Sequence, residues 1–364
     1  MMMRKRESWI DAWKGILILS VVAGHVAGGG CHLATGCACE TLRMVYFLIY
    51  AFHMPAFFFL AGWMWRDQPL WALASKRFVR LMIPYFVVGV ISIFLFALVG
   101  GNRVMDAAFT STYYQGLNEN NGVIVQNLLS LIQGGGWPNG QGFRYNTVLW
   151  FLPCMFVTLL ADGGLKLLVK GRAAILVVGV LLFVGGLVMQ GRGVGAWPWC
   201  LDRVPYYLLF VALGETLRGV WRNGVPRMRM PLLVSLLVLY GLAVWQVGYC
   251  YAIHTWLVHP ARFAITLCGI YLSMVLAQAV KGRVQTWLCA AGVCSMTIML
   301  WHKFVVIAAQ VKVPFVSAMY RSGLLGSALA TVLVTFGATV GCCFFAKIWD
   351  VVVLKVKRRM SRAS

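Results

Sequence analysis

Three histidines fall inside apolar stretches that are long enough to cross a membrane. His25 ends the run WKGILILSVVAGH, His53 lies in YAFHMPAFFF, and His302 lies in SMTIMLWHKF. Imidazole titrates near neutral pH, so it can act as a general base or as a nucleophile. Ionisable groups inside membrane spans are costly, which favours a functional role for them. For His25, the alternative is a neutral histidine that only packs and forms a hydrogen bond.

The stretch before His25 carries two more ionisable residues. Lys14 precedes His25 by eleven residues. In an α-helix this spacing leaves the two side chains about 20° apart around the axis and roughly 16 Å apart along it. Asp11 lies one turn before Lys14, and we expect these two to pair near the membrane surface. This helix face is therefore a candidate lining for a passage.

Two further residues, one near each of the other two histidines, affect the expected helix geometry. Pro55 removes one backbone hydrogen bond, so we predict a kink in the helix beside His53, near the middle of the span. Ser295 precedes His302 by seven residues and would share its helix face. All three histidines are predicted at middle to outer depth, which allows them to converge.

The composition places these residues in a membrane protein. Of 364 residues, 61% are hydrophobic and 12% are charged, and the mean hydropathy is +0.79. Repeated apolar runs of about 20 residues are typical of transmembrane helices. We predict an all-α polytopic membrane protein. About ten spans are expected, near 8–28, 44–64, 79–99, 147–161, 173–190, 204–218, 230–250, 257–279, 286–310 and 321–346.

The distribution of basic residues predicts the orientation of these spans. With a cytoplasmic N-terminus, the cytoplasmic segments hold 22 Lys and Arg residues and the opposite segments hold eight. This asymmetry favours cytoplasmic N- and C-termini. It also accounts for the net charge of +22 without nucleic acid, for which we find no motif. The first apolar stretch is interpreted as a retained span and not as a cleaved signal peptide.

Two basic residues and one polar stretch could contact substrates. Arg77 and Arg80 lie one turn apart on the cytoplasmic side, where arginine forks suit phosphate oxygens, although ordinary loop charge is the alternative. The outer stretch 100–146 combines aromatic and amide residues with glycines, a mixture found in sugar-binding loops and also in ordinary loops at the membrane interface. Within it, 123–132 predicts a short re-entrant or interfacial helix.

The cysteines and the absent motifs limit which kinds of metal site and enzyme are expected. Cys31, Cys37 and Cys39 cluster near His32 without a zinc-binding pattern. A disulfide is favoured over a metal if this loop is extracytoplasmic, and free thiols are the other alternative. No metal site is predicted. The chain contains no P-loop, HExxH or GxSxG motif. Its closely spaced glycines, such as those of GRGVG, lie in loops with no predicted strand before them, so no dinucleotide-binding fold is indicated.

Five motifs, taken in order, resemble acyltransferase family 3, a family of bacterial integral-membrane O-acyltransferases. They are WIDAWKGILILSVVAGH, FHMPAFFFLAGW, KRFVRLMIPY, LWFLPCMF and SMTIMLWHKF, and together they span nearly the whole chain. The resemblance implies that His25 is the catalytic residue and that Lys14 is its basic partner. It also implies that Arg77 and Arg80 bind acyl-CoA on the cytoplasmic side.

The resemblance also marks positions with less defined roles. His53, Trp150, Ser295 and His302 match recurrent family positions. We treat Lys14, His53, Ser295 and His302 as supporting catalytic candidates. We treat Asp11, Pro55 and Trp150 as residues that shape or line the helices.

The predicted activity is transfer of an acyl group, by family default acetyl, from cytoplasmic acyl-CoA to a hydroxyl of a surface or envelope glycan or glycolipid. Acyl-CoA is a co-substrate, and no permanently bound cofactor is expected. The expected location is the bacterial inner membrane, and no oligomeric state is predicted. We expect one transmembrane domain over 1–350, a basic tail over 351–364 and no appended SGNH domain. The alternative function is a transporter or flippase, although the spans hold few carboxylates and no repeated halves.

Overall fold

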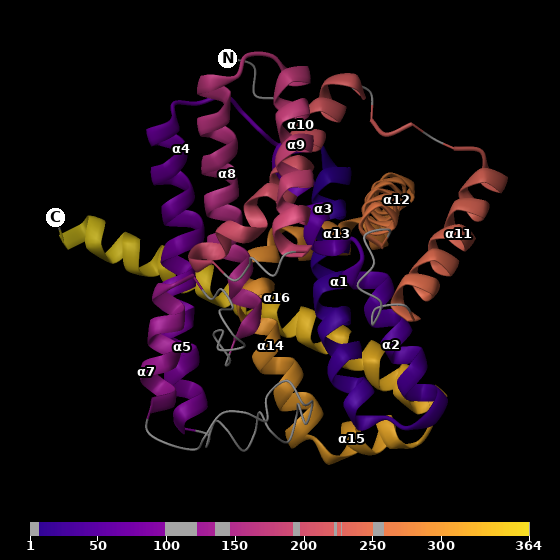
Figure 1. Ribbon diagram of the computed structural model, residues 1–364. Coiled ribbons are helices and arrows are strands. Elements are labelled where there is room, and N and C mark those ends of the chain that lie inside the picture. The colour runs from indigo at the N-terminus through magenta and orange to yellow at the C-terminus, as the bar shows by residue number, and fades with distance from the viewer. Residues whose placement is uncertain are drawn as a thin grey trace. The chain divides into compact units, whose positions relative to one another are not determined.

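The computed structural model describes residues 7–98, 122–134, 146–191, 197–221, 224–226, 228–249 and 258–363. Every regular element in this part of the chain is a helix (Figure 1). Seven of these helices or helix pairs are long and apolar enough to cross a membrane, or eight if one bent pair counts as a span. The prediction of an all-α polytopic membrane protein is confirmed, with seven or eight candidate spans among the described residues where about ten were expected.

Some sequence features lie outside the described residues. These are the basic residues 4–6, and almost all of the polar segments 111–122 and 134–146 of the outer stretch. The helix expected at 123–132 is described, and it is α7 (Gly122–Ile132). The orientation of the termini and the domain boundary at residue 350 stay predictions.

The chain divides into two compact units. The first comprises residues 1–49 and 272–364, and the second comprises residues 50–271. The helices of the first unit are α1 (Ser8–Leu33), most of α2 (Gly36–Tyr50), α13 (Gly282–Val293), α14 (Ser295–Lys312), α15 (Pro314–Arg321) and α16 (Leu324–Ala363).

In the first unit, α1 packs against α13, α14, α15 and α16. Gly15 of α1 makes the α13 contact very close, because a Cβ at this position would overlap the backbone carbonyl of Leu288. Small residues permit such approaches where helices associate in membranes. At the other end of α1, Gly36 adopts a positive φ of 54° and begins α2 after a short turn. Small side chains of this hairpin then pack against Tyr320 and Ala330.

The second unit holds the remaining helices. They are α3 (His53–Trp63), α4 (Leu70–Arg77), η1 (Phe78–Met82), α5 (Ile83–Leu98), α7, η2 (Thr147–Trp150), α8 (Phe151–Leu168), α9 (Arg172–Gly191), η3 (Pro198–Arg203), α10 (Val204–Val220), α11 (Met230–Tyr249) and most of α12 (Val258–Ala279). Helix α10 is central to this unit, because it packs against α3, α8 and α9.

Glycines again set the closest helix crossing of the second unit. A Cβ at Gly62 of α3 would overlap the carbonyl oxygen of Val211, and a Cβ at Gly214 of α10 would overlap that of Phe59. The two glycines therefore allow α3 and α10 to touch backbone to backbone. In the same unit, α7 packs against α5, and the Tyr85 hydroxyl donates to the carbonyl oxygen of Leu131 at 2.7 Å.

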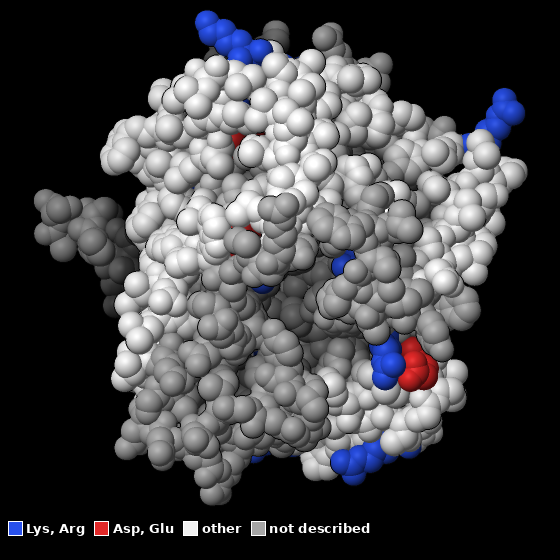
Figure 2. Space-filling view, viewed as in Figure 1, with Lys and Arg blue, Asp and Glu red and all other residues white. Residues whose placement is uncertain are grey.

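Large apolar side chains are exposed on several helices. Examples are Leu181 of α9, Leu239 of α11 and Phe344 of α16. Most of the described surface visible in Figure 2 is accordingly uncharged. In water such a surface would drive aggregation, whereas in a bilayer it contacts the lipid tails.

One predicted span has a different form in the structure. The stretch 286–310 was expected to be a single helix, but α13 and α14 meet at Cys294 and are bent by 84°. Hydropathy alone did not indicate this break, because the sequence there is apolar and contains no proline. The bend means that Ser295 begins α14, instead of lying in the middle of a straight span.

Candidate active site

The charged pair predicted on α1 is present. Lys14 Nζ lies 3.3 Å from Asp11 Oδ1, and the Asp11 side chain is almost fully buried while that of Lys14 is partly exposed. One turn of helix separates the two residues, so the pair follows from local geometry. On the same helix, the indole nitrogen of Trp13 donates to the hydroxyl of Ser273 at 2.9 Å. These contacts fix the rotation of α1 within the first unit.

Two of the predicted histidines lie together. The rings of His25 on α1 and His302 on α14 have centroids 5.3 Å apart and planes inclined by 40°. His25 is half-buried and His302 is fully buried. At the residue after His25, the Gln310 amide of α14 donates to the carbonyl oxygen of Val26 at 2.9 Å and holds the two helices together.

The tautomer of His302 follows from its hydrogen bond. Its Nδ1 lies 2.7 Å from the carbonyl oxygen of Ile298, one turn earlier in α14. A carbonyl can only accept, so Nδ1 carries the proton. The other ring nitrogen, Nε2, is buried and has no hydrogen-bond partner in the described structure. A neutral His302 therefore presents an unused lone pair inside the protein.

Ser295 lies on the same helix as His302 but at a different depth. It is the first residue of α14, seven residues before the histidine. This spacing corresponds to about 10 Å along a helix axis. A direct contact of both side chains with one small reacting group is therefore unfavourable in this geometry.

His53 belongs to the second unit and begins α3. It is buried, and its ring packs edge-on against Tyr50 with the centroids 4.7 Å apart. The interruption expected from Pro55 lies just before His53, where α2 ends at Tyr50 and α3 begins at His53. Pro55 cannot donate to the carbonyl of Ala51. The hydroxyl of Thr266 lies 2.8 Å from that oxygen and 2.8 Å from the carbonyl oxygen of Arg262 in its own helix, so its one proton is shared between the two acceptors.

The two arginines also lie in the second unit, around an irregular turn. Arg77 ends α4, and Arg80 lies in η1, a five-residue π-helix. π-helical turns are rare and occur often at functional sites. Arg80 is exposed, whereas Arg77 is half-buried and its Nε atom is buried without a hydrogen-bond partner. The pair therefore has donors available for an anionic ligand.

A comparison with protein-family models identifies the chain. The model described as an acyltransferase domain, of acyltransferase family 3, matches residues 7–347. The chain belongs to acyltransferase family 3. Searches of curated proteins and of solved structures gave no match. The matched range includes all five motifs, so the family member is a multi-pass membrane acyltransferase.

In this family member, Trp150 ends a 3-10 turn before α8. The Arg203 guanidinium lies over its ring at 4.6 Å from the centroid, and the ring also packs against Tyr207. These contacts join η2, η3 and α10 within the second unit. Trp150 thus packs between neighbouring helical elements, and its assignment as a residue that shapes the helices stays a prediction.

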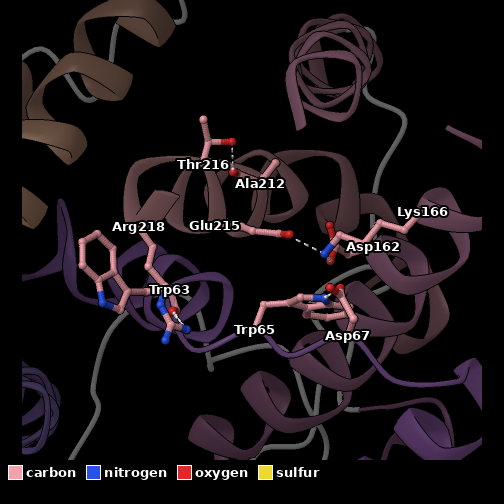
Figure 3. Close-up of polar contacts among 9 residues, drawn as sticks. All are labelled: Trp63, Trp65, Asp67, Asp162, Lys166, Ala212, Glu215, Thr216 and Arg218. Atoms are coloured by element: carbon pink, nitrogen blue, oxygen red, sulfur yellow. Dashed lines mark hydrogen bonds and ion pairs between the residues drawn. The ribbon is translucent and has the colours of Figure 1, made fainter. Parts of the chain in front are cut away.

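Sequence reasoning missed one charged cluster of the second unit. Lys166 of α8 contacts Asp162 at 2.6 Å and Glu215 of α10 at 2.5 Å, and its Nζ lies 3.4 Å from the centroid of the Trp65 ring (Figure 3). Asp162 was overlooked because the fourth span was expected to end at 161, whereas α8 continues to Leu168. The usable signal was the four-residue spacing of Asp162 and Lys166.

The cysteines of the α1–α2 turn separate into a pair and an exposed thiol. The sulfur atoms of Cys31 and Cys39 lie 2.8 Å apart, whereas Cys37 is exposed. Among the described residues, no group of three or more His, Cys, Asp or Glu side chains could hold a metal ion. The short distance between the Cys31 and Cys39 sulfur atoms makes this pair a candidate for oxidation.

Proposed function

We propose that this acyltransferase moves an acetyl group from cytoplasmic acyl-CoA to a hydroxyl of an envelope glycan or glycolipid. The proposed location is the bacterial inner membrane. The observation that carries the proposal is the contact of His25 with His302 inside an apolar helical unit. An imidazole at such a site can move a proton during acyl transfer.

The proposed catalytic residue is His25. As a general base, its ring nitrogen takes the proton of the sugar hydroxyl while the oxygen attacks the thioester carbonyl. The carbon–sulfur bond then breaks, and the thiolate of coenzyme A receives the proton from the imidazolium. As a nucleophile, the His25 ring nitrogen would instead attack the thioester carbonyl, and the carbon–sulfur bond breaks to release the coenzyme A thiolate. The sugar oxygen then takes the acyl group from the ring nitrogen, and the proton of the hydroxyl passes to the thiolate. Both routes give the same acetylated sugar and free coenzyme A.

The proposed phosphate-binding residues are Arg77 and Arg80. A buried guanidinium nitrogen without a partner, as at Arg77 Nε, is costly unless a ligand occupies it. The phosphates of acyl-CoA offer charged acceptors in the geometry that arginine prefers. Lys14 is the basic partner implied for His25. It lies on the same unit and its ammonium already pairs with Asp11.

The first experiment tests His25. Membranes from a host that lacks its own copy of the gene are supplied with radiolabelled acetyl-CoA, and label in the glycan fraction is counted. We expect His25→Ala to lower the transfer rate by at least about 100-fold, the range typical of a lost general base. His32→Ala is the matched control, because His32 is an exposed histidine of the same helix. Equal transfer by both variants would refute the catalytic assignment.

The second experiment tests the arginine pair. Arg77→Ala with Arg80→Ala should weaken acetyl-CoA binding by at least about 100-fold, since each of the two lost charged hydrogen bonds costs about 1.5–3 kcal/mol. Lys76→Ala is the control, because Lys76 is an exposed basic neighbour in α4. Unchanged affinity in the arginine variant would leave these residues as determinants of membrane orientation only.

A transporter remains the competing function to be tested. The bent pair α13–α14 resembles in form the discontinuous helices that transporters use. The family assignment favours the enzyme, because it describes an acyltransferase domain. Covalently bound label in the glycan supports the enzyme, whereas glycan movement without label would support transport.

A further inference from the structure

Only one of the two ring nitrogens of the fully buried His302 has a hydrogen-bond partner in the described structure. Its Nδ1–H donates to the carbonyl oxygen of Ile298 at 2.7 Å, which fixes the neutral tautomer with a lone pair on Nε2. That Nε2 atom is buried without a partner. Buried polar atoms are rarely left without a partner, because each one costs free energy. An apolar side chain of similar size would avoid this cost, so the lone pair requires an explanation.

The ring of His25 lies close to that of His302. The two centroids are 5.3 Å apart, close to the spacing of about 5 Å expected for two imidazoles joined by one N–H···N hydrogen bond. His25 is half-buried, so its side chain has room for a small rotation that His302 lacks. The helices that carry the two histidines are held together, because Gln310 of α14 donates to the carbonyl oxygen of Val26 in α1.

We propose that His302 is a positioning residue for His25. Its Nε2 accepts a hydrogen bond from one ring N–H of His25, which places the lone pair of His25 on its other ring nitrogen, the one proposed to react. The hydrogen bond on one nitrogen of a histidine decides which tautomer the ring adopts. His302 thus selects the reactive tautomer of His25 without contacting the substrate. This role rests on the proposed catalytic function of His25.

Three substitutions separate this role from simple packing. His302→Gln keeps an acceptor near the position of Nε2 but loses the ring Nδ1–H. His302→Asn can still donate to the Ile298 carbonyl but has no group at the Nε2 position. His302→Phe keeps the volume of the ring and loses both polar atoms. We expect the Gln variant to retain the most activity, and the Asn and Phe variants to lose at least about tenfold in kcat with little change in KM for acetyl-CoA.

The opposite ranking would overturn the proposal. If His302 only satisfies the Ile298 carbonyl, the Asn variant should be as active as wild type and the Gln variant should be impaired. His25→Ala is measured in the same radiolabel assay. Full activity of that variant would refute the proposed function. An inactive His25→Ala together with a fully active His302→Asn would refute only the role of His302.

A measurement without turnover tests the tautomer directly. Nitrogen-15 spectra of the full-length protein, labelled at histidine and held in detergent, distinguish protonated from unprotonated ring nitrogens. The signals of His302 are identified by their loss in the His302→Gln variant. We expect a protonated Nδ1 and an unprotonated Nε2. A proton on Nε2 would overturn the proposal whatever the activity of the variants.

Discussion

Gly292 of α13 lies directly against the backbone carbonyl of Asp11 in α1, so that a Cβ at this position would overlap that oxygen. Gly15 makes the reciprocal contact from α1 to α13. The two glycines bring the helix backbones together at the level of the Asp11–Lys14 pair. A crossing of this kind depends on the absence of side chains on both helices.

Gly292→Ala should therefore destabilise the first unit. The added methyl group forces α1 and α13 apart, and overpacking of this kind costs about 1–3 kcal/mol. The midpoint of thermal unfolding in detergent should fall, and acyl transfer should fall with it because α1 carries His25. Gly337→Ala is the control, since a Cβ at Gly337 of α16 meets open space. That change should be neutral or slightly stabilising, and an equal effect of both changes would contradict the crossing.

Lys166→Met should destabilise the second unit strongly. The variant leaves the fully buried Asp162 and its neighbour Glu215 without their shared cation. Loss of one partner from a buried ion pair typically costs about 3–5 kcal/mol. Thermal unfolding measures the effect, and Lys170→Met at an exposed lysine is the control. A restored midpoint in Lys166→Met combined with Asp162→Asn would support the ion-pair explanation, whereas an unchanged midpoint in the single variant would contradict it.

Thr266→Val should lower the thermal unfolding midpoint by destabilising the helix interruption before His53. The hydroxyl of Thr266 donates to the carbonyl of Ala51, which Pro55 leaves without its usual helical donor. A buried carbonyl left unsatisfied costs about 1–3 kcal/mol. Thr216→Val is the matched control, because its hydroxyl donates only to a carbonyl of its own helix, that of Ala212.

A double substitution tests the link between the proline and the threonine. Pro55→Ala provides a backbone N–H that can reach the Ala51 carbonyl. Thr266→Val should then lower the unfolding midpoint less in the Pro55→Ala background than in the wild type. Strictly additive effects would mean that the threonine does not compensate for the proline.

Cys31 and Cys39 should form a disulfide when the protein reaches an oxidising compartment. Their sulfur atoms lie 2.8 Å apart across the α1–α2 turn. Oxidation removes two protons and two electrons from the thiols, which a dithiol oxidoreductase in its disulfide form accepts. Cross-linking a loop of this size should stabilise the protein by about 2.5 kcal/mol.

Alkylation before reduction, followed by mass spectrometry, measures the state of these cysteines. We expect a peptide cross-linked between Cys31 and Cys39, together with an alkylated Cys37, whose thiol is exposed. Full alkylation of all three residues without reduction would contradict the disulfide. It would also argue against the predicted outer location of this turn.

Several features of this acyltransferase could be predicted from the sequence because they depend on neighbours in the chain. Apolar runs define membrane helices wherever they occur, since the bilayer imposes the same length on each. The Asp11–Lys14 pair follows from the helical repeat. The interruption near His53 follows from the chemistry of Pro55, which lacks a backbone donor wherever it is placed.

Other features required the tertiary structure because they join residues that are distant in the chain. His25 and His302 are 277 residues apart, and their contact depends on how α14 packs against α1. The bend at Cys294 lies in an apolar sequence without a proline, and Gly292 beside it packs against the backbone of α1, a contact that the sequence alone does not show. Lys166 and Glu215 meet because α8 packs against α10. Hydropathy specifies which segments become helices, but the fit of side chains between helices determines which of their faces meet.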